Sequence, residues 1–263
     1  MAEHQNVSII GSGNLAWHLA PALDNAGYVV KEVYSRNARH AEKLTSRLYQ
    51  AEVKTSLDFS DSASRIFIIA VSDEAITDVA SEIVLPDNSH LIHTSGSQPL
   101  SVLQFAAIDN IGALYPLQTF SKNKKIDFKT VPLFVESAQA GTEKLMLTLA
   151  RAISNKVTRT SAEERKALHL AACIAADFTN HMMTIASDLL KQHKMSFDLI
   201  KPLITETINK GMGLGPENTQ AGPAHNGDLE TLDRHLEALS DDPAVAEIYK
   251  IVSQHIIDRH NKE

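Results

Sequence analysis

The sequence has a single cysteine, Cys173, among 263 residues, so no disulfide can form within one chain. Such sparse use of cysteine is typical of a reducing compartment. The first residues, Met1–Asn6, have neither the basic nor the apolar stretch of a signal peptide. No apolar run is long enough to cross a bilayer. We therefore expect a cytoplasmic protein that does not enter a membrane.

Positive charge is also scarce, because 25 Lys and Arg residues stand against 32 Asp and Glu residues, a formal net charge of -7. This balance argues against nucleic acid or an anionic membrane as the main partner. The 12 histidines are scattered, without a His-Glu-x-x-His motif or paired cysteines, so we expect no metal site. No Gly-x-Ser-x-Gly motif marks a hydrolase nucleophile.

The most informative stretch lies near the amino end of the chain. Val7–Ile10 is apolar and β-prone, Gly11 and Gly13 permit a tight turn, and Ala16 is small enough for a helix to pack on the strand. This is the Gly-x-Gly-x-x-Ala form of the dinucleotide-binding fingerprint, in which the helix start faces a pyrophosphate. The alternative is a glycine turn without a ligand. We expect cofactor contacts from Gly11, Ser12, Gly13, Asn14 and Leu15.

Strand-like and helical patterns alternate up to about residue 160. Ile66–Val71 is a continuous apolar run, as expected for a strand covered on both faces. The expected strands are 7–10, 29–34, 51–54, 66–71, 91–94, 111–115, 131–136 and 156–159, and the expected helices are 15–26, 38–49, 75–84 and 142–153. This order predicts an α/β fold with a doubly wound, mostly parallel sheet.

From Ala162 onward the pattern is entirely helical. We predict one long helix to about Lys191, a second from Ser196 to about Lys210, a loop rich in Gly and Pro over 212–226, and two further helices. The domains expected are a dinucleotide-binding domain over 1–160 and an all-α domain over 161–263. The long helix is apolar on more than one side, which favours a homodimer through the C-terminal helices; burial within its own domain is the alternative.

The end of the second strand indicates which nicotinamide cofactor is bound. A domain selective for NAD carries Asp or Glu there, whereas this chain has Ser35 and Arg36, which suit a 2′-phosphate. Arg39 and His40 follow closely. The prediction is NADP(H), against the alternative that Arg36 is only a solvated loop charge.

Other candidate cofactor residues follow later strands, because ligands of such sheets lie beyond the carboxyl ends of the strands. We expect Val71 and Ser72 near the nicotinamide half, with Thr94, Ser95 and Gly96 beside them. The alternative for Thr94 and Ser95 is that they only cap a turn. Tyr115 could face a substrate or be a core residue with a satisfied hydroxyl.

Taken together, several motifs resemble one family, the Rossmann-like NADP oxidoreductases with a C-terminal domain of unknown function of the DUF2520 type. The N-terminal motifs are Gly11–Ala16, Val33–Arg36, Ile69–Asp73, His93–Ser97 and Leu114–Phe120, and the C-terminal ones are Leu168–Ala172 and Gly222–Asp228. The chain is more distantly similar to pyrroline-5-carboxylate reductase, ketopantoate reductase and the deazaflavin-dependent NADP reductases. Several of those are dimers built through their helices.

The resemblance also implies site residues. In the related reductases a Lys and an Asn on the long helix face the nicotinamide and the substrate carbonyl, and the matching positions are His169 and Asp177. The family more often has Asn at position 177 and Arg at position 226, where this chain has Asp177 and Asn226. The loop Gly222–Asp228 would close over the site, unless Asp228 simply caps the next helix.

Independently of the resemblance, His169, Cys173, Asp177 and Asn180 recur at spacings that place them on one face of an α-helix. Imidazole can supply the proton that hydride transfer to C=O or C=N requires. Together with the resemblance, this leads us to expect His169, Asp177 and Asn180 to be catalytic; the alternatives are a buried structural histidine at position 169 and a polar interface group at position 177. The predicted function is hydride transfer between NADP(H) and a small polar carbonyl or imine compound, the alternative a non-catalytic NADP(H)-binding sensor or scaffold.

Overall fold

The structure, a computed structural model, describes residues 5–260. The chain divides into two compact units, Met1–Ala175 and Ala176–Glu263. The boundary therefore lies later than the residue 160 expected from the sequence. The reason is that helix α5 (Ala162–Ala172) is anchored to the first unit by its own side chains, as described below.

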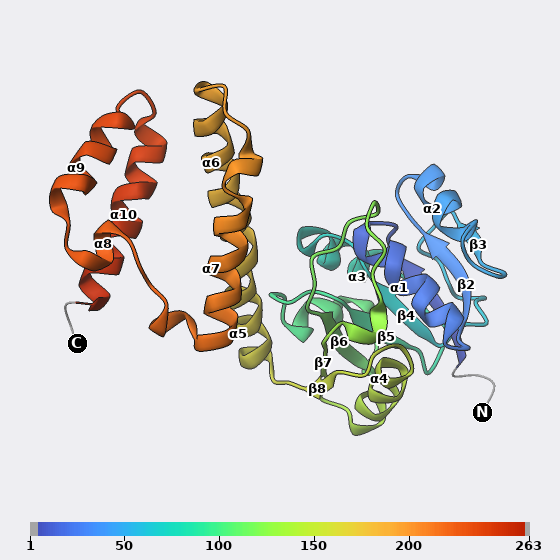
Figure 1. The fold of residues 1–263 in the computed structure, drawn as a ribbon. Helices are drawn as coiled ribbons and strands as arrows, with labels where there is room; N and C mark the ends of the chain where they lie inside the picture. The colour runs from blue at the N-terminus through green and yellow to red at the C-terminus, as the bar shows by residue number, and fades with distance from the viewer. Residues whose placement is uncertain (1–4, 261–263) are drawn as a thin grey trace. The chain divides into compact units, whose positions relative to one another are not determined.

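The first unit is built on one eight-stranded sheet in the order β3-β2-β1-β4-β5-β6-β7-β8 (Figure 1). The strands are β1 (Asn6–Ile10), β2 (Val29–Tyr34), β3 (Glu52–Lys54), β4 (Ile66–Ile69), β5 (His90–His93), β6 (Ile111–Pro116), β7 (Leu133–Glu136) and β8 (Val157–Arg159). The order reverses at β1 and β4, which is the point where doubly wound sheets bind ligands. The α/β fold and the Rossmann-like N-terminal domain predicted from the sequence are confirmed.

Two strands, β7 and β8, run against the other six. β6 and β7 pair antiparallel, with Leu114 opposite Val135, whereas every other neighbouring pair is parallel. Parallel neighbours need a crossover of a dozen or more residues, usually an α-helix, and the 117–132 connection contains only a short 3-10 helix, Phe128–Thr130. The sheet is thus mostly parallel, as expected.

Four α-helices connect the strands, and they bury two separate cores. They are α1 (Asn14–Asn25), α2 (Ala38–Thr45), α3 (Ile76–Glu82) and α4 (Ala140–Ile153). Successive residues of β4 point to opposite faces, so Ile66 and Ile68 join one core while Phe67 and Ile69 join the other. Both cores hold the sheet edge in place where β1 and β4 end.

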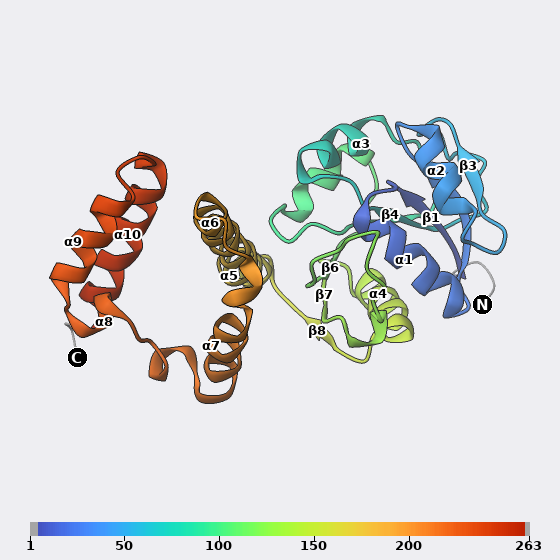
Figure 2. The same ribbon diagram turned by 45° about the horizontal axis from the view of Figure 1, so that its top comes forward.

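The second unit is helical, as predicted. Its helices are α6 (Thr179–Gln192), α7 (Lys201–Leu214), α8 (Pro223–Asn226), α9 (Leu229–Ala238) and α10 (Pro243–His260). Helices α8, α9 and α10 lie side by side, as Figure 2 also shows. Asp228 accepts a hydrogen bond from the Thr231 N–H at 3.0 Å and caps α9, so the capping alternative for this residue is confirmed. None of the described helices is both long and apolar enough to cross a bilayer.

Candidate functional site

The turn between β1 and α1 is held tightly against the end of β4. Gly11 has φ +121°, and a Cβ atom placed on it would lie 2.2 Å from the Ala70 carbonyl oxygen. The Gly11 N–H donates to the Tyr34 carbonyl at 2.8 Å, which ties the turn to β2. Glycine at position 11 is therefore required by the protein's own packing.

Gly13 has a different environment. The nearest atom to a Cβ built there is the Ala70 carbonyl oxygen, at 4.0 Å, so the space beside this residue is open. Gly13 is also the N-cap of α1, which has no side-chain cap and no acidic residue in its first turn. The amide donors at the helix start are thus left for another acceptor, the arrangement in which helix N-termini bind phosphate.

A cleft of about 710 Å³ opens at this turn. Nine of the predicted cofactor residues line it, namely Gly11, Ser12, Gly13, Asn14, Leu15, Ser35, Arg36, Val71 and Ser72. The structure thus brings together the residues of the glycine turn and of the ends of β2 and β4. The volume of the cleft falls within the range of small-molecule and cofactor sites.

At the end of β2 the lining becomes cationic. Ser12 Oγ donates to Ser35 Oγ at 2.8 Å, so the two hydroxyls fix the turn beside the strand end. Arg36 and His40 line the cleft next to them, whereas Arg39 does not. An exposed guanidinium beside two hydroxyls is suited to a phosphate monoester.

Lys122 is a lining residue that the sequence did not reveal. It lies in the connection between β6 and β7, more than a hundred residues after the glycine turn, yet its Nζ donates to the Ser12 carbonyl at 2.8 Å. Its ammonium group therefore adds a positive charge at the turn. No local spacing links positions 12 and 122, so only the folded chain shows this contact.

Thr94, Ser95 and Gly96 do not line this cleft. Thr94 Oγ1 donates to the Ile69 carbonyl at 3.1 Å, and Ser95 Oγ accepts from the Ser97 and Gln98 amides at 3.1 and 3.0 Å. In both residues the hydroxyl group bonds to the backbone, as expected if Thr94 and Ser95 cap a turn. Direct contact of the three residues with a cofactor remains a prediction.

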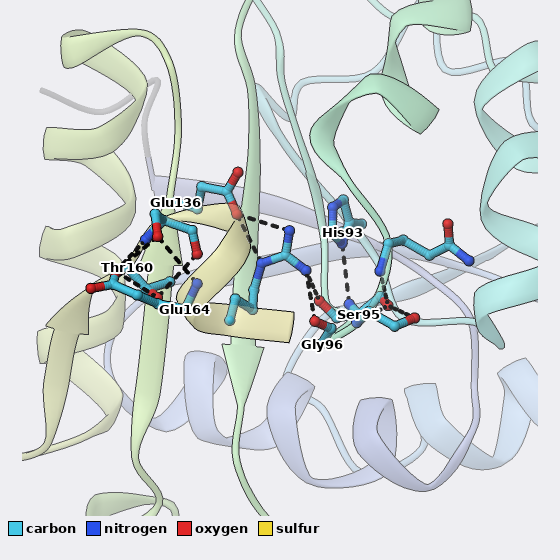
Figure 3. A network of polar contacts seen from close by, with 10 residues as sticks. His93, Ser95, Gly96, Glu136, Thr160 and Glu164 are labelled. Atoms are coloured by element: carbon cyan, nitrogen blue, oxygen red, sulfur yellow. Dashed lines mark hydrogen bonds and ion pairs between the residues drawn. The ribbon is translucent and has the colours of Figure 1, made fainter. Parts of the chain in front are cut away.

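A buried ion pair holds α5 against this turn (Figure 3). Arg165 is fully buried, its Nε and Nη2 lie 2.9 and 2.8 Å from Glu136 Oε2, and its Nη1 donates to the Ser95 and Gly96 carbonyls at 2.9 and 3.0 Å. Upstream, Ser161 and Glu164 form a capping box that begins α5. The backbone N–H and the hydroxyl of Ser161 donate to Glu164 and lower the pKa of its carboxyl group.

One turn after Arg165, on the same face of α5, lies His169. Its Nδ1 lies 3.2 Å from the Tyr115 hydroxyl, and its Nε2 lies 3.7 Å from Cys173 Sγ. A Cβ on Gly96 would come within 2.7 Å of His169 Nδ1 and 2.8 Å of Tyr115 Cε2. The missing side chain at position 96 thus makes room for the pair. Tyr115 is only 8% exposed, so it is a core residue whose hydroxyl contacts His169.

His93 is a second histidine at this sheet edge and is fully buried. Its Nδ1 accepts from the Ser95 N–H at 3.2 Å, which leaves the ring proton of the neutral form on Nε2. Burial is the main cause that lowers its pKa to about 3, and the Arg165 charge lowers it further. His93 is therefore neutral near pH 7 and stabilises the Ser95 turn as an acceptor.

Asp177 and Asn180 lie in the second unit and are exposed. Between α5 and α6 the chain is π-helical over Cys173–Phe178, where hydrogen bonds run to the fifth residue. The α-helical spacing on which the shared face of these residues was predicted does not hold through this segment, so a common face for Asp177 and Asn180 with His169 stays a prediction. His169 and Cys173 do lie on one face of the helix, since their side chains are in contact.

Comparisons with known proteins agree with this geometry. Residues 6–95 match the family described as coenzyme F420-dependent NADP oxidoreductase, and residues 131–256 match the domain of unknown function DUF2520. A Bacteroides fragilis protein described as an NADP oxidoreductase is 35% identical over 97% of this chain and 99% of its own, with a TM-score of 0.88. No curated protein matches the chain.

Two less similar structures share the fold. A Streptomyces aurantiacus imine reductase is 16% identical over 97% of this chain and 95% of its own, with a TM-score of 0.68. A reductive aminase from Aspergillus terreus, in complex with NADPH and ethyl-5-oxohexanoate, is 14% identical over 98% of this chain and 94% of its own, with a TM-score of 0.72.

Proposed function

Because the chain belongs to the family of NADP oxidoreductases that carry a C-terminal DUF2520 domain, its cofactor is NADP(H), and we propose that it transfers hydride between NADP(H) and a small polar carbonyl or imine compound. The observation that carries this proposal is the contact of His169 with Tyr115 and Gly96, at the same sheet edge as the cofactor cleft. That the reductive aminase and the imine reductase act on this class of compound supports the choice of substrate.

The residues of the cleft would suit the pyrophosphate and the nicotinamide half of the cofactor. The uncapped start of α1 and the open side of Gly13 suit the pyrophosphate, and Lys122 adds a cation beside it. Val71 and Ser72, after β4, would flank the nicotinamide half. The bound cofactor supplies or accepts the hydride. His169 would donate a proton to the substrate oxygen or nitrogen, with the Tyr115 hydroxyl as its hydrogen-bonding partner.

The test is oxidation of NADPH with a panel of keto acids, aldehydes and imines, followed by the absorbance of the reduced cofactor. We expect turnover with at least one compound, abolished by His169→Ala. The control His255→Ala removes an exposed histidine of the second unit and should leave turnover unchanged. Tight NADPH binding without turnover across the panel would instead favour the sensor or scaffold function.

Arg36 is proposed to hold the 2′-phosphate of the cofactor. Charge-assisted hydrogen bonds contribute about 1.5–3 kcal/mol, so Arg36→Ala should reduce the preference for NADPH over NADH about tenfold or more. The neighbouring Arg39→Ala is a matched control, because Arg39 lies outside the cleft lining. An unchanged ratio of the two dissociation constants in Arg36→Ala would contradict the assignment.

Asp177 is proposed to support the reaction on the strength of the family resemblance, and Asn180 because it follows Asp177 by three residues, about one helical turn. The family more often has Asn at position 177, so Asp177→Asn restores the common residue. If Asp177 acts as a carboxylate, this substitution changes the pH profile of turnover. If it only holds the substrate by an accepted hydrogen bond, turnover persists with an unaltered profile, because an amide oxygen also accepts.

The second unit is proposed to form a homodimer through its helices. Helices α6, α7 and α10 bury none of their residues, and large apolar side chains such as Leu203, Ile208 and Ile251 are exposed. A second copy of the chain could cover this apolar surface. Sedimentation should show a dimer at micromolar concentration, and Leu203→Glu should shift it to monomer. The control Phe105→Glu, on the first unit, should not.

A further inference from the structure

The first unit contains a second cavity, of about 860 Å³, which no motif in the sequence marks. It lies between the later turns of α1, the segment 122–129 and the end of α4. Within the described chain, its lining shares only Lys122 with that of the cofactor cleft. The cavity is thus a separate site next to the cofactor cleft.

Its lining is strongly cationic in a protein whose net charge is -7. The cations are Arg47, Lys122, Lys124, Lys125 and Lys129, with His18 beside them, and Asp127 is the single carboxylate. Among the described residues, none of these five cations forms an ion pair with an acidic side chain at the wall. Like charges held around one concave surface repel each other, and they raise the local concentration of anions.

Part of this cationic wall is fixed in place. The Arg47 guanidinium lies 4.0 Å from the centre of the Trp17 ring and donates to the Trp17 carbonyl through one nitrogen, while its other N–H groups are not used in that bond. Lys129 Nζ donates to the Ala152 carbonyl at 2.7 Å. Apolar lining from Pro21 and Phe128 lies among the charges. The cavity therefore offers both cations and an apolar surface.

We propose that this cavity binds a small organic polyanion with two or more phosphate groups. Arginine and lysine side chains favour phosphate, and several of them on one wall favour more than one phosphate group. Its volume suits a small molecule. The apolar wall can pack against the organic part of such a ligand.

Lys122 couples the two sites. Its Nζ is bonded to Ser12 in the glycine turn and lies 5.2 Å from the centre of the Trp17 ring in the second cavity. A polyanion attracts this ammonium group and adds negative charge near the cofactor phosphates. Its binding therefore weakens NADPH binding, and by linkage NADPH weakens the polyanion to the same degree.

Trp17 is the only tryptophan of the chain and lines the cavity, so its fluorescence reports occupancy. Sodium tripolyphosphate, titrated at constant ionic strength, should change this fluorescence with saturation, and calorimetry should give the same affinity. Inorganic phosphate should bind at least about tenfold more weakly, because it reaches fewer cations. The absence of saturable binding by both methods would overturn the proposal.

Substitutions distinguish this cavity from the cofactor cleft. Lys124→Gln with Lys125→Gln should weaken tripolyphosphate about tenfold or more and leave NADPH affinity in the absence of tripolyphosphate nearly unchanged, since neither residue lines the cleft. The control Lys43→Gln with Lys144→Gln removes the same charge from exposed positions outside the cavity and should have little effect. An equal loss of tripolyphosphate affinity in both double variants would show that the anion is attracted by the general charge of the protein, and would overturn the proposal.

Two further outcomes decide the coupling. Saturating tripolyphosphate should raise the NADPH dissociation constant of the unsubstituted protein several-fold. The double variant Lys124→Gln with Lys125→Gln should reduce this effect. An NADPH dissociation constant that tripolyphosphate leaves unchanged would refute the coupling. If Arg36→Ala abolishes tripolyphosphate binding while the Lys124 and Lys125 double variant keeps it, the anion occupies the cofactor cleft and the proposed site is wrong. A failure of NADPH itself to bind would refute the cofactor assignment and leave the tripolyphosphate result standing.

Discussion

Replacing Arg165 with Met should destabilise the first unit by several kcal/mol. The Arg165 side chain is fully buried and makes two contacts with Glu136 and one with each of two carbonyls. Without it, Glu136 becomes a largely buried carboxylate with no counter-charge, and the Ser95 and Gly96 carbonyls lose a donor. Breaking a buried ion pair from one side costs about 3–5 kcal/mol, so we expect about 4 kcal/mol.

The assay is urea unfolding followed by Trp17 fluorescence, which reports on the first unit because Trp17 lies in α1. The matched control is Arg159→Met. Arg159 pairs with Glu143 at 3.1 Å, but its side chain is 67% exposed, so its loss should cost less than about 1 kcal/mol. Equal destabilisation by the two substitutions would refute the argument from burial.

A double variant separates the charge from the hydrogen bonds. Arg165→Met with Glu136→Leu removes both ions, so the uncompensated carboxylate is absent and the loss should be smaller than the sum of the single losses. The Ser95 and Gly96 carbonyls still lack their donor, so stability should not fully return. If the losses in the free energy of unfolding were additive, Arg165 and Glu136 would have no interaction energy with each other. Turnover should fall in every Arg165 variant, because α5 also carries His169.

Three other substitutions test the same region. The lowered pKa of His93 means that the unfolded chain binds more protons than the folded chain between about pH 3 and 6.5. The free energy of unfolding therefore falls as the pH is lowered, by about 1.6 kcal/mol from pH 6.5 to 5. His93→Asn, which keeps an acceptor for the Ser95 N–H, should remove this dependence in urea titrations. Gly96→Ala should lower turnover more than about tenfold, because the new methyl group displaces His169 and Tyr115. The affinity for NADPH should be nearly unchanged. A raised NADPH dissociation constant would instead favour direct contact between Gly96 and the cofactor. Gly11→Ala should weaken NADPH binding in titrations and lower the melting temperature, because the methyl group meets the Ala70 carbonyl.

The strands of the first unit could be predicted because their side chains are patterned over short distances. The Ile66–Ile69 stretch is apolar at every position since its two faces belong to two cores. The antiparallel β7 could also have been inferred, because no helical pattern separates it from β6. The positions of Lys122 and Arg165 could not be predicted. Lys122 contacts Ser12, and Arg165 contacts Ser95 and Glu136, at separations of 110, 70 and 29 residues, and no periodicity connects these positions.

The long helix shows where pattern reasoning fails and why. Its extent was predicted well, since the chain is helical from Ala162 to Gln192. The π-helical segment was not predicted. A single shift in the hydrogen-bonding pattern leaves the apolar composition unchanged but turns every later side chain around the helix axis. The shared face predicted for His169 and Cys173 was unaffected, and the two side chains are in contact.

The anchoring of α5 also bears on where the chemistry is assembled. Arg165 and His169 occupy one face of this helix, and both make their contacts within the first unit, at Ser95, Gly96, Tyr115 and Glu136. The helix is begun by its own capping box and held by a buried ion pair, so the position of His169 depends on the sheet that also forms the cofactor cleft. The proton donor proposed for the reaction is therefore held by the same sheet as the cleft proposed for the cofactor, as the fixed geometry of hydride transfer requires.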